Sequence, residues 1–129
     1  MASFTELDVW KKARSIRMQI KELTASFPVD EKFRLTDQII RSSRSIGNNI
    51  AEGHGRFHYQ DNIRFCVIAR GSLTETLDHL IVGFDDGLVS KEQFTILKDE
   101  IDLCMAKLNG YILFIKTKRD AIGVVSKTN

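Results

Sequence analysis

The chain contains few residues that could interrupt a helix, and this limits its fold more than any other feature. A single proline, Pro28, occurs in 129 residues, and the 8 glycines gather at a few places. Proline and glycine most disfavour a helix interior, so long stretches of this sequence can remain helical. No segment alternates apolar and polar residues over the length of a strand. The sequence therefore predicts an all-α protein.

Apolar residues recur at helical spacing in four segments. The first lies within residues 5–27, the second begins between residues 30 and 36 and ends near residue 52, the third covers 60–85 and the fourth 90–118. Steps of three and four residues place each apolar stripe on one face of its helix. Four such helices with short connections bury their stripes together in an antiparallel, up-down-up-down four-helix bundle, which is the predicted architecture.

The length and the helix boundaries indicate one domain. We expect the bundle to occupy residues 1–118 and the polar residues 119–129 to form a C-terminal tail that frays. Ser90 and Gln93 have the spacing of a capping box, which marks the start of the last helix.

Three glycines have predicted structural roles. Gly53 and Gly87 occupy the position just past a predicted helix end, where a left-handed backbone conformation is favoured. Gly71 falls in the middle of the third helix, where glycine costs about 1 kcal/mol relative to alanine. We interpret Gly71 as a point where the backbone of a neighbouring helix approaches closely.

Charge and composition exclude several classes of protein. The net charge of +2 is too small to indicate a nucleic-acid-binding protein by itself, but the first 70 residues hold 12 Lys and Arg against 8 Asp and Glu. This basic half is compatible with an anionic partner. No apolar run approaches the roughly 20 residues that span a bilayer, and no signal peptide is visible, so we expect no membrane association. Cys66 and Cys104 lie inside apolar helical patterns and are predicted to be buried thiols of a cytoplasmic protein.

The sequence lacks the motifs of catalytic and metal sites. A di-iron bundle needs paired Glu-x-x-His motifs, and the chain has none. His54 and His58 flank a loop, but two histidines without supporting carboxylates are a weak metal signal. Cys66 has no evident histidine partner that would activate it as a nucleophile. We therefore expect no metal, no cofactor and no enzymatic activity.

The segment between Arg41 and Arg56 differs most from an ordinary helix, because it is rich in serine, asparagine and glycine. Helical spacing divides it into two faces. The face predicted to point inward consists of Ser43, Ile46, Gly47, Ile50 and Ala51. The polar face consists of Arg41, Arg44, Asn48 and Glu52. Small inward residues allow helices to approach closely, while the polar face is available to a subunit contact or an anionic partner.

Several motifs resemble those of a known bacterial family. They are Leu7-x-Val9-Trp10-x-Lys12-Ala13, Leu35-Thr36-x-Gln38-Ile39, Asn49-Ile50-Ala51-Glu52-Gly53-x-Gly55-Arg56 and Ala69-x-Gly71-Ser72-x-x-Glu75. Over about residues 4–117 the chain is similar to the four-helix-bundle proteins encoded in intervening sequences of 23S ribosomal RNA genes. The resemblance implies a ring-like homo-oligomer, a homopentamer. It also implies RNA or DNA as a partner, because related bundle proteins accessory to diversity-generating retroelements associate with nucleic acid.

Two sets of residues are candidate functional sites. The leading hypothesis is a non-enzymatic, oligomeric bundle that binds nucleic acid through a basic face. Its phosphate contacts are predicted to come from Lys11, Lys12, Arg14, Arg41, Arg44 and Arg56. The second set, a polar network or interface, consists of Ser45, Asn48, Asn49, Glu52, Ser72 and Glu75.

Three alternatives remain open at this point. In the first, the arginines pair with carboxylates such as Asp37 or Glu52 at subunit contacts. In the second, the assembled bundle is a scaffold that binds a protein partner and no nucleic acid. In the third, a small-molecule or enzymatic pocket is built from Asn49, Glu52, Ser72 and Glu75, although a hydrogen-bonded core network accounts for the same residues.

Overall fold

The computed structural model describes residues 3–128 and the side chains of residues 3–123. Its four long helices are α1 (Asp8–Thr24), α2 (Leu35–His54), α3 (Tyr59–Asp85) and α4 (Lys91–Thr128). Two short 3-10 helices, η1 (Phe4–Glu6) and η2 (Val29–Glu31), precede α1 and α2. The described residues contain no β-strand. The prediction of an all-α protein is confirmed.

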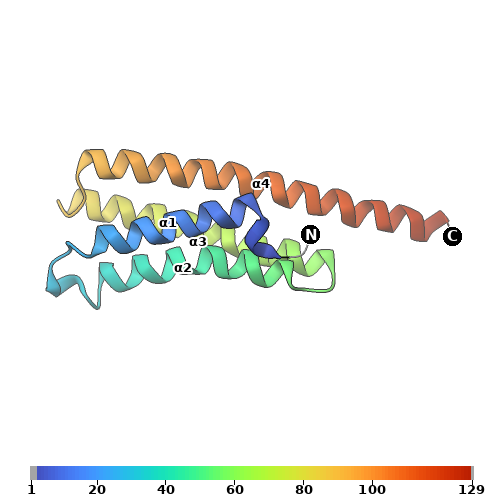
Figure 1. Ribbon diagram of the computed structural model, residues 1–129, viewed down its shortest axis with the longest axis horizontal. Helices are drawn as coiled ribbons and strands as arrows, with labels where there is room; N and C mark the ends of the chain where they lie inside the picture. Colours follow the sequence, from blue (N-terminus) through green and yellow to red (C-terminus); the bar gives the residue numbers. More distant parts are fainter. Residues whose placement is uncertain (1–2, 129) are drawn as a thin grey trace.

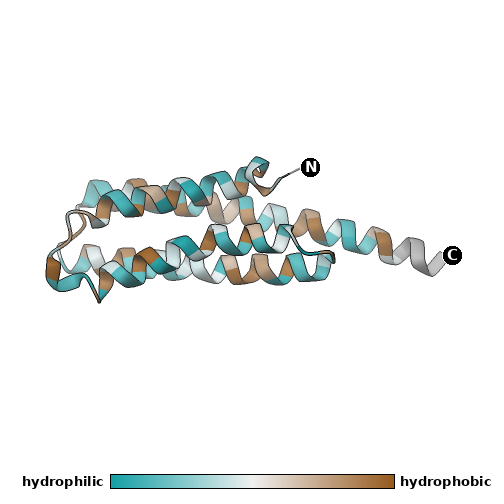
Figure 2. Cartoon of the chain, turned by 60° about the horizontal axis from the view of Figure 1, so that its bottom comes forward, coloured by the Kyte–Doolittle hydropathy of each residue, from teal (hydrophilic) through white to brown (hydrophobic). Residues whose placement is uncertain are grey.

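The four helices form an antiparallel bundle in which each helix packs against two others. Successive helices run in opposite directions (Figure 1), and α1 and α3 each contact both α2 and α4. Apolar and polar residues are interspersed along each helix (Figure 2), and the apolar ones recur at helical spacing, so that one face of each helix can be buried. The fully buried large side chains include Ile16, Ile20, Ile39, Ile46, Ile50, Leu73, Leu80 and Leu108. The predicted stripes therefore meet in one core, and Cys66 and Cys104 are buried in it.

The connection between α3 and α4 follows the sequence prediction closely. Gly87 has a left-handed backbone with φ 76°, the conformation that glycine adopts without strain. At the start of α4 the Ser90 N–H donates to Gln93 Oε1 at 2.9 Å, and the Gln93 N–H donates to Ser90 Oγ at 3.1 Å. This is the reciprocal pair of a capping box, which is confirmed.

The roles predicted for Gly53 and Gly71 were wrong. The close approach of a neighbouring helix expected at Gly71 is found at Gly53 instead. Gly53 lies inside α2 and is buried. A Cβ at Gly53 would lie 2.7 Å from Asn62 Oδ1 and 3.0 Å from Phe65 Cβ, so Gly53 is where α3 approaches α2 closely. A Cβ at Gly71 would meet no described atom within 4 Å. Glycine is required at Gly53 for space, whereas at Gly71 nothing in the described chain requires it.

The predicted tail over residues 119–129 is helical where the structure describes it. Helix α4 continues to Thr128 and extends past the turn between α2 and α3 (Figure 1). Arg119 Nη1 donates to Gln60 Oε1 at 2.9 Å, and Arg119 Nε donates to Asp120 Oδ1 at 3.0 Å. These contacts and the lack of proline after Arg119 allow the helix to continue. Asn129, the last residue of the predicted tail, lies outside the described residues.

Candidate nucleic-acid interface

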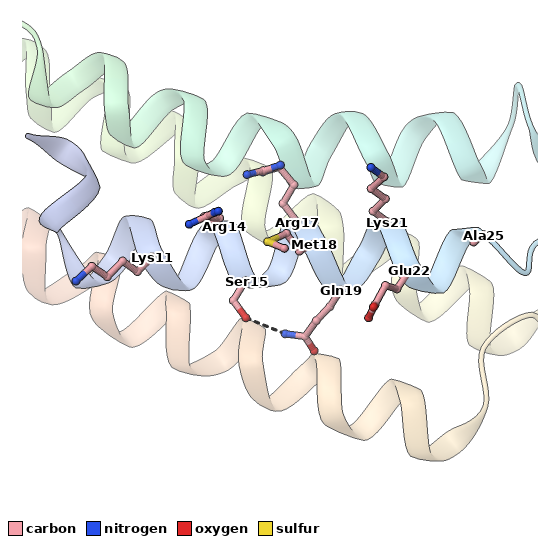
Figure 3. A pocket seen from close by; sticks show the side chains of 9 residues that line it. All are labelled: Lys11, Arg14, Ser15, Arg17, Met18, Gln19, Lys21, Glu22 and Ala25. Atoms are coloured by element: carbon pink, nitrogen blue, oxygen red, sulfur yellow. Dashed lines mark hydrogen bonds between the residues drawn. The ribbon is translucent and has the colours of Figure 1, made fainter.

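The outer face of α1 carries a row of positive charges. Ala13, Ile16 and Ile20 are buried and orient the helix, which leaves the opposite side to the solvent. Lys11, Arg14, Arg17 and Lys21 are all exposed on that side, at steps of three or four residues. Figure 3 shows the side chains of Arg17 and Lys21 reaching from α1 toward α2. These two side chains therefore lie on the side of α1 that faces α2.

A groove between α1 and α2 collects arginines from both helices. It is lined by Trp10, Arg14, Arg17, Arg44, Gly47 and Asn48. Among the described residues, no Asp or Glu lines it, and none of its three arginines forms an ion pair with a carboxylate. We call this feature the basic groove. Its lining offers only hydrogen-bond donors of positive charge and a few neutral polar groups, an arrangement suited to an anion.

Gly47 and Trp10 form the floor of the basic groove. A Cβ at Gly47 would lie 3.4 Å from Trp10 Nε1, so the indole packs directly on the α2 backbone. The Phe4 ring packs against the indole, edge to face, with centroids 5.1 Å apart. The position of the indole N–H is thus fixed by packing, and it adds a neutral donor to the groove.

Three of the other four predicted cations lie elsewhere and have partners. Lys12 Nζ lies 2.8 Å from Glu100 Oε2 of α4, in a half-buried ion pair. On α2, Arg41 pairs with the carboxylate one turn before it, that of Asp37, at 3.1 Å. Arg56 pairs with Glu52 at 2.8 Å, and its guanidinium also lies 4.8 Å from the centroid of the Phe65 ring. The structure therefore brings Arg14 and Arg44 together, leaves Lys11 exposed on α1, and turns the other three away from the groove.

Arg17 belongs to the basic groove and was missing from the predicted set. It follows Arg14 by three positions, so the helical spacing that selected Arg14 also selects Arg17. This signal was present in the sequence. Asn48, predicted as part of a polar network, lies in the basic groove instead.

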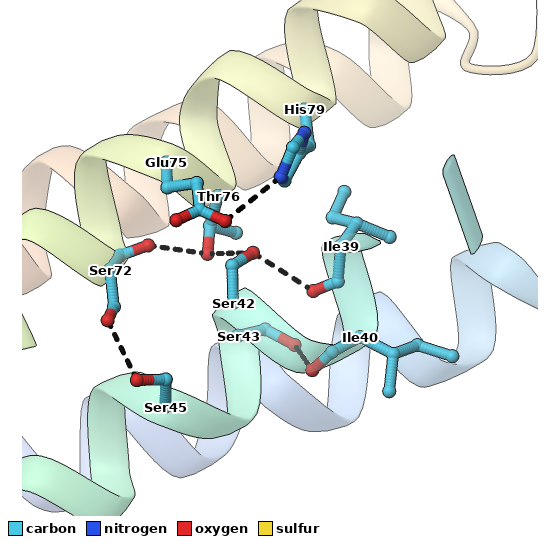
Figure 4. A network of polar contacts seen from close by, with 9 residues as sticks. All are labelled: Ile39, Ile40, Ser42, Ser43, Ser45, Ser72, Glu75, Thr76 and His79. Carbon is cyan, nitrogen blue, oxygen red and sulfur yellow. Dashed lines mark hydrogen bonds and ion pairs between the residues drawn. The ribbon is translucent and has the colours of Figure 1, made fainter. Parts of the chain in front are cut away.

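The predicted polar network is real but has different members (Figure 4). The hydroxyls of Ser45 and Ser72 are 2.8 Å apart and link α2 to α3. Asn49 Nδ2 donates to Ser45 Oγ at 2.9 Å and to the Ser45 carbonyl at 2.8 Å. The remaining carboxylates stay outside this network: Glu52 pairs with Arg56, as above, and Glu75 lies 3.2 Å from His79 Nε2. Glu52 and Glu75 thus contact their own helix or the adjoining loop rather than Asn49 and Ser72.

The centre of the network is a pair that the sequence analysis missed. Thr76 Oγ1 lies 2.9 Å from Ser42 Oγ and 2.9 Å from the carbonyl oxygen of Ser72. Ser42 and Thr76 are both buried between apolar residues. Ser42 lies three positions after Ile39, and Thr76 three positions after Leu73, so each small polar residue continues an apolar stripe. That position is the signal that could have identified them.

Burial also determines the chemistry of the thiols. It raises the pKa of Cys66 to about 12 and that of Cys104 to about 12, so both remain protonated at neutral pH. Burial likewise raises the pKa of Tyr111, against the opposing effect of its hydrogen bond from Asn62.

Within the described residues, no three His, Cys, Asp or Glu side chains gather as metal ligands would. None of the helices there combines the length and apolar character needed to cross a membrane.

Comparison with known proteins identifies the family. A sequence model of the family described as 23S rRNA-intervening sequence protein matches residues 5–110. The chain belongs to this family. A crystal structure at 1.70 Å of a protein of unknown function from the S23 ribosomal protein family of Bacteroides thetaiotaomicron VPI-5482 has the same fold, with a TM-score of 0.74 and 26% identity. The alignment covers 81% of this chain and 97% of that chain. No curated protein matched the sequence.

The extent of the family match separates two parts of the molecule. The basic groove lies entirely within the residues matched to the 23S rRNA-intervening sequence family. Helix α4, in contrast, continues from the end of the match at residue 110 to Thr128. The residues of α4 after 110 therefore lie outside the family match, although Ile112 and Ile115 among them belong to the core.

Proposed function

We propose that this 23S rRNA-intervening sequence protein binds the phosphate backbone of RNA or DNA in the basic groove. The observation that carries the proposal is the gathering of Arg14, Arg17 and Arg44 around a groove that no described carboxylate lines. Like charges held together without acidic partners repel one another, and a bound polyanion removes this repulsion. Backbone contacts alone carry no sequence information, so the proposed activity is general for nucleic-acid phosphates.

The donors in the basic groove are of the kinds that bind phosphate oxygens. Each arginine presents a planar fork of N–H donors that can bind two oxygens of one phosphate. Asn48 and the indole of Trp10 add neutral donors of the kind that also contact nucleic-acid backbones. The groove thus supports binding of an extended anion along α1 and α2.

The proposed role is binding without catalysis. The buried cysteines have pKa values raised to about 12 and are poor nucleophiles at neutral pH. The carboxylates Glu52 and Glu75 are exposed and contact side chains of their own helices or the adjoining loop. Neither arrangement supports an activated catalytic group.

The salt dependence of binding tests the proposal. Single-stranded nucleic acid should bind with a slope of log K against log salt of about −0.7 for each phosphate neutralised, so three contacts weaken binding about 20-fold between ~50 and ~200 mM salt. The double variant R17Q/R44Q should make the slope shallower by about 1.4. The double variant R64Q/R70Q removes the same charge from the exposed side of α3 and should keep the wild-type slope.

Fluorescence anisotropy of a labelled oligonucleotide gives both quantities. If the two double variants lose affinity equally, the basic groove is not the site. Binding that does not change with salt excludes phosphate contacts altogether. In that case the alternative of a scaffold for a protein partner, without nucleic acid, is preferred.

Assembly of several copies is the second part of the proposal. Large apolar side chains are exposed on the outer faces of α3 and α4, including Val67 at 54%, Leu103 at 46% and Leu113 at 66%. Exposed apolar surface of this kind favours association. Light scattering after size exclusion should give a mass that is a multiple of 14.7 kDa, five-fold for the homopentamer that the family resemblance implies. A monomer at micromolar concentration would exclude the ring.

A further inference from the structure

A second hollow lies at the end of the bundle where α2 turns into α3. One wall is formed by Phe57, His58 and Tyr59 of this turn, and the other by Tyr111 and Phe114 of α4. Helix α4 passes beside the turn and continues beyond it (Figure 1). We call this hollow the end groove. Because Tyr111 and Phe114 follow residue 110, one wall lies outside the family match.

The aromatic rings of the end groove are exposed. Phe57 is 95% exposed, Phe114 55% and Tyr59 40%. Phe57 has one aromatic neighbour, the ring of His58, which it meets edge to face at 5.0 Å. Aromatic side chains usually stabilise a fold by burying their large apolar surface, and Phe57 contributes little in this way. The faces of these rings are therefore available to a ligand.

The wall on α4 is held in place from inside the bundle. Asn62 Nδ2 donates to the Tyr111 hydroxyl at 3.3 Å, and Asn62 itself is buried. Asn62 Oδ1 also accepts from Cys66 Sγ at 3.5 Å. This buried chain of contacts joins α4 to α3 beneath the exposed rings. The hydrogen bond from Asn62 therefore holds Tyr111, at the base of the α4 wall, in a fixed position for a ligand.

One cation without an ion pair among the described residues, Lys118, lies beside the rings. Arg56 also lines the end groove and Arg119 lies on the adjoining surface, but these two pair with Glu52 and Asp120. Among the described residues, no Asp or Glu lines either part. Lys118 Nζ lies 5.3 Å from the centroid of the Phe114 ring, so a cation stands directly beside an exposed aromatic face. The groove matches a ligand that carries both flat rings and negative charge.

We propose that the end groove binds single-stranded nucleic acid by stacking unpaired bases on Phe57, Tyr59 and Phe114. Lys118 contacts the phosphate between the stacked bases. Bases stack on aromatic side chains irrespective of sequence, and sites that bind single strands combine such rings with positive charge. A duplex keeps its bases paired and stacked on one another, so it cannot use these rings. The inference rests on the proposed function, since both require nucleic-acid binding, but it adds selectivity for single strands.

The test compares a short labelled single strand with the matching duplex by fluorescence anisotropy at ~50 mM salt. Phe57→Ala should weaken single-strand binding about 10-fold and leave duplex binding unchanged. Phe57→Leu should show the same loss, because leucine keeps an apolar side chain but lacks a ring. Phe57→Tyr should bind like the wild type. Phe33→Ala is the matched control: Phe33 is 84% exposed and lies beside Lys32, but at the opposite end of the bundle.

Four outcomes would overturn the inference. Wild-type affinity in Phe57→Leu would show that stacking is not used. An equal loss on the duplex, or an equal loss in Phe33→Ala, would show that the effect is not specific to the end groove. A change in the mass of the assembly in Phe57→Ala would assign the ring to a contact with a second copy.

The same experiment separates this inference from the proposed function. If R17Q/R44Q weakens binding of both the single strand and the duplex while Phe57→Ala has no effect, the proposed stacking in the end groove is wrong and phosphate binding in the basic groove is supported. If wild-type protein binds neither the single strand nor the duplex, the proposed function fails and the inference fails with it.

Discussion

Replacing Gly53 with alanine would place a methyl group where α2 and α3 leave no room for it. The new Cβ would lie 2.7 Å from Asn62 Oδ1, 3.0 Å from the Asn62 carbonyl oxygen and 3.0 Å from Phe65 Cβ. Two of these three atoms are a backbone oxygen and a Cβ, which move only with the helix. The third belongs to an amide that hydrogen bonds to Tyr111 and Cys66. No flexible side chain is present to yield.

The expected cost follows from three contributions. Alanine is favoured over glycine in a helix by about 1 kcal/mol. Overpacking a close contact costs about 1–3 kcal/mol, and here the upper end applies because the neighbours are rigid. Displacing Asn62 would add about 1 kcal/mol for a lost hydrogen bond. The free energy of unfolding should therefore fall by about 3 kcal/mol, a change of about 150-fold in the ratio of folded to unfolded protein.

Urea unfolding followed by far-UV circular dichroism measures this change, at one protein concentration because association contributes to stability. Gly71→Ala is the matched control, since it adds the same methyl group to α3 where no described atom lies within 4 Å. It should raise the free energy of unfolding by up to about 1 kcal/mol. If Gly53→Ala is as stable as the wild type, or if both variants gain stability, the reasoning about close approach is refuted.

Three further predictions concern the hydroxyl network, the Lys12 ion pair and the buried thiols. Thr76→Val removes a buried hydroxyl and should lower the free energy of unfolding by about 1–2 kcal/mol in the same assay, whereas an unchanged value would show that the network is dispensable. Lys12→Met should leave the salt slope of nucleic-acid binding at its wild-type value, because Lys12 is engaged with Glu100; a shallower slope would return Lys12 to the phosphate site. The thiols of Cys66 and Cys104 have a folded pKa of about 12, above the unfolded value of 9.0. The two thiols should therefore leave the melting temperature unaffected below pH ~9 and lower it as the pH rises toward ~12. Cys66→Ala should reduce this fall. An identical pH profile in Cys66→Ala would contradict the prediction.

The fold could be predicted from the sequence because local patterns determine most of it. Steps of three and four residues identified each buried stripe, and the capping box of Ser90 and Gln93 located the start of α4. The helix beyond Arg119 was missed because the polar and charged residues of this segment were interpreted as a fraying tail. Nothing in the local sequence signalled that Arg119 would contact Gln60, a residue 59 positions earlier.

The candidate site was predicted less well, since it depends on which helices become neighbours. The pair of Arg41 and Asp37 is visible in the sequence as a step of four residues. The pair of Lys12 and Glu100 spans 88 positions and is visible only in the fold. Spacing alone could not show that Gly53 faces another helix while Gly71 does not, because both glycines satisfy the same helical pattern.

The hydroxyl pair of Ser42 and Thr76 bears on how α2 and α3 are aligned along their length. Two apolar stripes could pack equally well after sliding past each other by one turn, about 5.4 Å. Such a slip would carry the Thr76 hydroxyl away from Ser42, from which it is now 2.9 Å, and would leave both in apolar surroundings. The pair therefore selects one register for the two helices, and with it the relative height of the residues that each helix presents at its surface.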